Sequence, residues 1–167
     1  GVAPQASLHL HDYASASAGG ASSWAGWWAS GTADAEADGA VVQNNSWGFD
    51  DSQTANSNWA INDYVTYMNN NSLTASQTLA AHASLDNDGN GSNDISFSNT
   101  AAQWDTYIAA LNSFQDTGVI VFALSNDSTD DDADVSAALP ELYSSLEEAW
   151  ITVANIDVRV IHLKLIH

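Results

Sequence analysis

The sequence predicts an α/β fold in which a mainly parallel sheet is flanked by helices. Residues 119–123 are apolar without interruption and rich in β-branched side chains, which is typical of a parallel strand buried on both faces. Residues 101–117 carry apolar side chains at helical spacing, and Gly118 ends this stretch. A helix therefore leads into a buried strand. Open α/β sheets bind their ligands at the carboxyl end of such strands.

The start of the chain shows the same alternation of elements. Residues 7–13 alternate apolar and polar side chains and predict a strand. Residues 22–37 predict a helix that Gly39 ends, and residues 40–46 predict a second strand. A strand, a helix and a strand in close succession indicate a βαβ unit.

The middle of the chain, about residues 50–100, is an insertion between two such units. Within it, residues 58–70 and 73–83 predict two helices. Residues 150–156 predict a fourth strand, so we expect four parallel strands in one sheet. The last ten residues, 158–167, differ in composition: they form either an edge strand or an atypical tail beyond the natural domain.

Composition excludes several functions. The 167 residues include 21 acidic and 2 basic side chains, and no Lys or Arg precedes Arg159. Such a chain repels nucleic acid and anionic lipid. It has no run of apolar residues long enough to insert into a membrane, and no Cys for a disulfide or thiolate site. The acidic surface suits a saline or calcium-containing exterior, or serves solubility alone.

Two groups of residues could bind metal. His9 and His11 lie on one side of the first predicted strand and, with Asp12, could contribute to a zinc site, or they are ordinary polar strand residues. A hydrophilic loop places oxygen ligands at alternating positions around two glycines, as calcium loops do. These ligands are Asp86, Asp88, Asn90 and Asp94. Phe97 replaces the bidentate Glu of a calcium loop, so a plain acidic turn is the alternative.

Asn126 is the sharper candidate for catalysis. It follows the buried strand 119–124, where its carboxamide could donate a hydrogen bond into a cleft or merely shape a turn. No Gly-x-Ser-x-Gly nucleophile motif occurs in the sequence.

The order of four segments resembles the subtilisin-like serine protease (subtilase) family. Gly-Val-Ala-Pro-Gln-Ala-Ser-Leu at 1–8 is similar to the segment that follows the catalytic-His helix. Val-Gln-Asn-Asn-Ser-Trp-Gly at 42–48 resembles the strand that lines the S1 pocket. Gly-Val-Ile-Val-Phe-Ala-Leu-Ser-Asn at 118–126 resembles the strand that carries the oxyanion-hole Asn, and residues 149–157 resemble the next strand.

The resemblance implies a subtilisin-like three-layer sandwich, incomplete in this chain, with Asn126 as the oxyanion-hole donor. It also assigns two walls to the S1 pocket. One wall is Ser46, Trp47 and Gly48, and the other is Ala123, Leu124 and Ser125. Ser125 stands where the family has Gly, which would narrow the pocket, and Trp47 is bulky.

The family motifs that carry the catalytic Asp, His and Ser are absent from the sequence. We therefore expect residues 1–157 to be a partial subtilase catalytic domain, from a secreted endopeptidase acting on polypeptides at the cell exterior or surface. The chain by itself should be inactive, and calcium would be its structural cofactor. The alternative is a non-catalytic, acidic, calcium-binding module for extracellular binding or adhesion.

Overall fold

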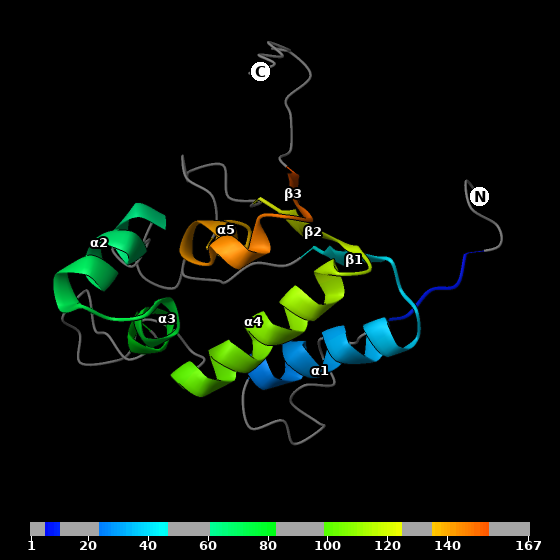
Figure 1. Ribbon diagram of the computed structural model, residues 1–167, viewed down its shortest axis with the longest axis horizontal. Helices are drawn as coiled ribbons and strands as arrows, with labels where there is room; N and C mark the ends of the chain where they lie inside the picture. Colours follow the sequence, from blue (N-terminus) through cyan, green and yellow to red (C-terminus); the bar gives the residue numbers. More distant parts are fainter. Residues whose placement is uncertain (1–5, 11–23, 47–60, 83–98, 125–134, 154–167) are drawn as a thin grey trace, which may run out of the picture.

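The computed structural model describes residues 6–10, 24–46, 61–82, 99–124 and 135–153. Within them, three strands form one parallel sheet in the order β1-β2-β3 (Figure 1). The strands are β1 (Val42–Asn45), β2 (Val119–Ala123) and β3 (Trp150–Val153). The α/β class and the strands predicted at 40–46, 119–124 and 150–156 are confirmed where the chain is described.

Both long predicted helices are present, as α1 (Trp24–Ala37) and α4 (Ala101–Gln115). Helix α4 begins with a capping box: the Thr100 hydroxyl accepts from the Gln103 backbone N–H, and the Gln103 side chain accepts from the Thr100 N–H. These two bonds satisfy donors that the first turn of a helix leaves unpaired.

Helix α1 ends before Gly39, as the sequence predicts, and the structure shows a Schellman motif there. Gly39 has a φ of 78°, a left-handed conformation that glycine adopts without a Cβ penalty. Its N–H donates to the Glu36 carbonyl at 2.9 Å, and the Ala40 N–H donates to the Ala35 carbonyl at 2.9 Å. The chain then enters β1 directly.

The insertion contains the two predicted helices, α2 (Ile61–Asn71) and α3 (Ala75–His82). A further short helix, α5 (Leu139–Leu142), and the 3-10 turn η2 (Ser144–Leu146) were not predicted. Each is too short to show a helical stripe of apolar residues, so periodicity gives no signal for either.

The strand predicted at 7–13 is wrong where it can be compared. Residues 6–10 are described and form no strand, whereas residues 11–13 lie outside the described part. Leu8 and Leu10 are each 79% exposed. No described strand pairs with this segment, and apolar alternation produces a strand only when a neighbour pairs with it and buries one face.

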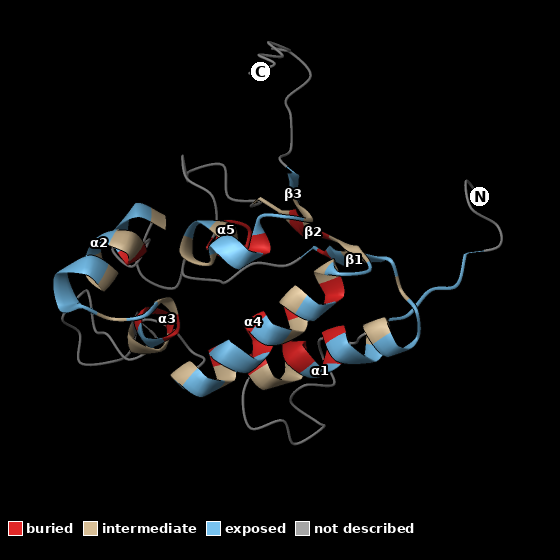
Figure 2. Cartoon of the chain, in the orientation of Figure 1, coloured by how far each residue is buried: buried red, intermediate tan, exposed pale blue. Residues whose placement is uncertain are grey.

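The core lies between the sheet and the helix pair α1 and α4, which lie side by side (Figures 1 and 2). The two helices run in the same direction: the Ala25 N–H donates to Asn99 at one end, and Ser113 donates to Glu36 at the other. Aromatic rings fill the contact between the helices, and β2 closes the core with two fully buried side chains. The rings belong to Trp28, Trp104 and Tyr107, and the β2 side chains are Ile120 and Phe122.

On the opposite face of the sheet, the side chains of the edge strands β1 and β3 are exposed, whereas those of the central strand β2 are half-buried. Val42 is 60% exposed, Ile151 49% and Val153 52%. Parallel sheets are normally covered on both faces. The described elements therefore supply a sheet layer and one helical layer, and the second helical layer of the expected sandwich is not among them.

Candidate functional site

The carboxyl ends of β1 and β2 lie next to each other. Asn45, the last residue of β1, pairs with Phe122 near the end of β2. The following residues on the two strands are Ser46, which is exposed, and Ala123 and Leu124, which are half-buried. The structure thus brings together three residues predicted to line a substrate pocket.

A buried amide lies just inside this edge. Asn45 is 5% exposed, and its side-chain N–H donates to the Val121 carbonyl at 3.4 Å, across the β1–β2 pair. Its oxygen accepts from the Gln43 side chain at 3.1 Å, and Asn44 donates to the Ser46 hydroxyl at 2.9 Å. The two Asn45 bonds hold the end of β1, because an unpaired buried amide would be costly. The Asn44 bond joins two exposed side chains next to it.

The remaining predicted site residues lie outside the described residues. They are Trp47, Gly48, Ser125 and Asn126 of the predicted protease site, Asp86, Asp88, Asn90 and Asp94 of the predicted calcium loop, and His11 and Asp12 of the possible zinc site. The assignments of an oxyanion donor and of calcium ligands therefore stay predictions. The same applies to the two pocket walls beyond Ser46, Ala123 and Leu124.

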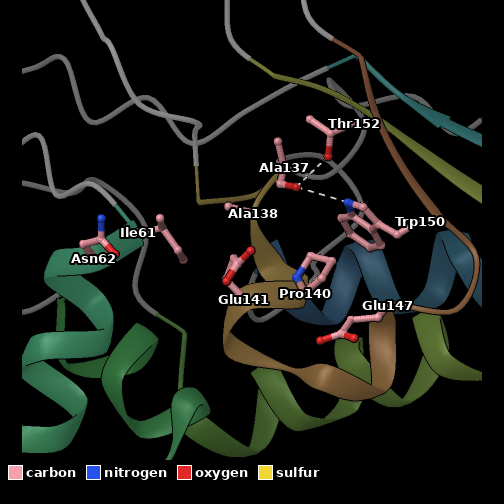
Figure 3. A pocket seen from close by; sticks show the side chains of 9 residues that line it. All are labelled: Ile61, Asn62, Ala137, Ala138, Pro140, Glu141, Glu147, Trp150 and Thr152. Carbon is pink, nitrogen blue, oxygen red and sulfur yellow. Dashed lines mark hydrogen bonds between the residues drawn. The ribbon is translucent and has the colours of Figure 1, made fainter. Parts of the chain in front are cut away.

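A separate cavity of about 540 Å³ lies beside β3 (Figure 3). The described residues that line it come from three parts of the chain: the start of α2, the α5 segment, and the stretch from Glu147 into β3 itself. These residues are Ile61, Asn62, Ala137, Ala138, Pro140, Glu141, Glu147, Trp150 and Thr152. None of the residues predicted to line the protease pocket is among them.

Hydrogen bonds and ring stacking fix one wall of this cavity. The Ala137 carbonyl accepts from the Trp150 indole N–H at 3.1 Å and from the Thr152 hydroxyl at 3.0 Å. The Trp150 ring stacks on Phe122 with a centroid distance of 4.8 Å. The cavity could not be predicted from the sequence because its residues are far apart in the chain. Their one local signal is the acidic pair Glu141 and Glu147, in and after the unpredicted helix α5.

A second polar cluster joins three helical segments. The Ser76 hydroxyl of α3 donates to the Asp105 carboxylate of α4 at 2.5 Å, and it also hydrogen-bonds the Tyr143 hydroxyl at 2.8 Å. Burial raises the pKa of Tyr143 to about 12; the Ser76 hydrogen bond opposes this shift and the Asp105 charge adds to it. Ser76 is 2% exposed, so a substrate cannot reach it, and the cluster ties the insertion to the core.

Metal ligands do not converge within the described ranges. No group of three or more His, Asp or Glu side chains there is placed to hold a metal ion. His9 hydrogen-bonds Asp38 at 2.8 Å on the surface. No helix in the described ranges is both long and apolar enough to cross a membrane.

Comparisons of the chain with protein-family models, curated proteins and solved structures find no match.

Proposed function

We propose that the chain is the central part of the catalytic domain of a secreted subtilisin-like serine endopeptidase that acts on polypeptides. The observation that supports this most is the parallel pairing of β1 with β2. It places Ser46 and Leu124, which come from two separate family-like motifs, at the same edge of one sheet. Parallel α/β sheets bind ligands at this edge.

In this proposal, the substrate lies between two walls at that edge. Ser46, Trp47 and Gly48 form one wall, and Ala123, Leu124 and Ser125 form the other. Asn126 follows the second wall directly and donates to the oxyanion as negative charge develops on the scissile carbonyl. The Asp, His and Ser of the triad come from other parts of the parent protein, and the parent completes the three-layer sandwich.

Substitution of Asn126 in the parent enzyme tests the proposal. Asn126→Leu nearly preserves volume but removes the donor, so turnover should fall by about a hundredfold, the size found for a single oxyanion-hole donor in subtilisin itself. KM should change little, because the bond strengthens only in the transition state. Unaltered turnover by the folded variant would refute the oxyanion role and leave Asn126 as a turn residue.

The chain alone should be inactive. A hydroxyl needs an adjacent base to become a nucleophile, and the family's triad motifs are absent here. A fluorophosphonate probe should therefore label no serine in the isolated 167-residue chain. Labelling at any serine would show an activated nucleophile and contradict the assignment of the triad to other segments.

We further propose that the acidic loop at 86–94 binds structural calcium, in keeping with an extracellular or cell-surface location. Carboxylates at alternating positions around glycines are suited to this ion. Calorimetric titration should detect binding to the chain at millimolar calcium, and Asp88→Ala should abolish it. The matched change Asp116→Ala removes one exposed carboxylate from the end of α4 and should leave binding intact. Absence of heat with the unmodified chain would overturn the calcium proposal.

A further inference from the structure

The cavity beside β3 has a size suited to a side chain or small ligand. Its volume of about 540 Å³ lies within the range of small-molecule sites, about 300–1,000 Å³. Ile61, Ala138, Pro140 and Trp150 give it apolar walls on more than one side (Figure 3).

The Trp150 wall is preformed. The indole N–H is bound to the Ala137 carbonyl, and one ring face is covered by Phe122. Thr152 donates to the same carbonyl, so its hydroxyl hydrogen is also committed. A ligand therefore meets a fixed apolar surface and does not have to order it, which favours binding.

Two carboxylates border the cavity. Glu141 and Glu147 are both exposed and lie on either side of Pro140 in Figure 3. The described residues contain no Lys or Arg, so neither carboxylate has such a partner within them. The chain as a whole carries a formal net charge of −19. The cavity therefore attracts cations and repels anionic ligands.

The apolar walls favour a Lys or Arg side chain over a metal ion as the bound cation. A divalent metal ion requires several oxygen ligands that converge on one point, and the described residues hold no such group of acidic side chains. The side chains of Lys and Arg instead combine an apolar stem with a charged tip. The stem would pack against Pro140 and Trp150 while the tip reaches the two carboxylates.

We propose that this cavity binds a Lys or Arg side chain of a partner polypeptide. Glu141 and Glu147 are the charge-recognising residues, and Trp150 with Pro140 is the apolar platform. The inference does not depend on the proposed protease function, because it concerns a surface that shares no described residue with the predicted substrate pocket and requires no triad.

The test is a titration of the full chain with the tripeptide Gly-Lys-Gly, followed by NMR through the indole N–H signal of Trp150. The signal is assigned by its loss in Trp150→Phe. It should shift saturably with Gly-Lys-Gly but not with Gly-Nle-Gly, whose norleucine side chain keeps the stem without the charge. A shift of equal size and midpoint with both peptides would overturn charge recognition.

Matched variants separate this site from the general negative charge of the protein. Glu141→Gln with Glu147→Gln should weaken Gly-Lys-Gly binding by about three- to tenfold, as expected for the loss of two exposed charge pairs. Glu148→Gln with Asp116→Asn removes the same charge outside the cavity and should leave the midpoint within about twofold. Equal weakening by both pairs, or no saturable Trp150 shift at tens of millimolar peptide, would refute the site.

Discussion

The two faces of the β1-β2-β3 sheet differ sharply in burial although the same strands make both. On the face toward α1 and α4, Ile120 and Phe122 are completely buried. On the other face, Val42 and Val153 remain more than half exposed. Central strand β2 is apolar at all five positions, the pattern of a strand buried on both sides. The sequence of a strand thus indicates how much burial the strand can accept. The exposure of each face depends instead on which elements cover it.

Removal of a large side chain from each face gives the largest expected contrast. Phe122→Ala should reduce the free energy of unfolding by about 3–5 kcal/mol, because it opens a cavity under Trp150 and the helix layer. Ile151→Ala, on the exposed face, should cost less than about 1 kcal/mol. Urea unfolding followed by circular dichroism measures both. A similar loss for Ile151→Ala would show that its face is covered in solution.

Gly118 tests how closely the covered face is packed where α4 joins β2. A Cβ there would lie 2.5 Å from the Phe114 ring and 3.0 Å from the Val41 carbonyl oxygen. Gly118→Ala should therefore cost about 2 kcal/mol by overpacking. In a Phe114→Leu background, this cost should fall by at least half.

Gly39→Ala is the control for that cycle. Apart from its own chain neighbours, nothing lies within 4 Å of its added Cβ, so its cost comes from the left-handed backbone alone. The cost should be the same with Phe114 or Leu at position 114. Thermal unfolding of the single and double variants gives the coupling energy. Lack of coupling between positions 114 and 118 would contradict the overpacking.

Tyr143, on the covered side of the sheet, makes the free energy of unfolding depend on pH. Its pKa is raised from 10.0 to about 12, chiefly by burial, so the folded state retains the phenolic proton more tightly than the unfolded state. The stability from this group is complete below pH 10 and is lost as the pH rises through about 12. The loss should be less than about 2 kcal/mol at pH 12.

Comparison with Tyr143→Phe isolates that contribution. Burial also raises the pKa of Tyr107, but Tyr107 is present in both proteins and cancels in the difference. The variant should lose less stability than the parent chain between pH 10 and pH 12, whatever its stability at neutral pH. Parallel alkaline profiles in denaturant titrations would show that Tyr143 is not buried as the structure has it.

The smallest expected effect is at the start of the helix that covers the sheet. Thr100→Ala removes the side-chain acceptor of the α4 capping box and should cost about 1 kcal/mol. Thr106→Ala is the matched change inside the same helix, where the hydroxyl only donates to the Ala102 carbonyl, and it should be neutral or slightly stabilising. Thermal midpoints distinguish the two, and equal shifts would argue against the cap.

Local patterns in the sequence were sufficient for the long elements. Helix α4 and strand β2 each carry a periodic or continuous apolar signal. Gly39 marks a helix end that needs a left-handed backbone, and Gly118 marks one where a Cβ would meet Phe114. The short helix α5 has no such signal. Residues 7–10 show the opposite error, since their alternating pattern predicts a strand but no strand in the described part of the chain pairs with them.

Sequence predicted the position of one candidate site but not of the other. Residues that immediately follow a predicted strand, such as Ser46 and Leu124, could be placed at a sheet edge from sequence because parallel strands share one carboxyl end. The cavity beside β3 could not, because Ile61, Glu141 and Trp150 meet only through tertiary packing. Sequence therefore predicts residues at the edge of a sheet better than it predicts cavities that form between elements by tertiary packing.

The Schellman turn at Gly39 also determines which face of the sheet each side chain of β1 occupies. After this turn, Gln43 and Asn45 of β1 lie on the face toward the helices and Val42 lies on the opposite face. Hydrophobicity alone would favour the reverse orientation. The Val119 N–H donates to the Val41 carbonyl at 3.0 Å, and this hydrogen bond fixes the register of β1 against β2. Deletion of Ala40 would advance the strand by one position and turn every β1 side chain to the other face. One residue of linker length thus determines which chemistry β1 presents at the edge where it meets β2.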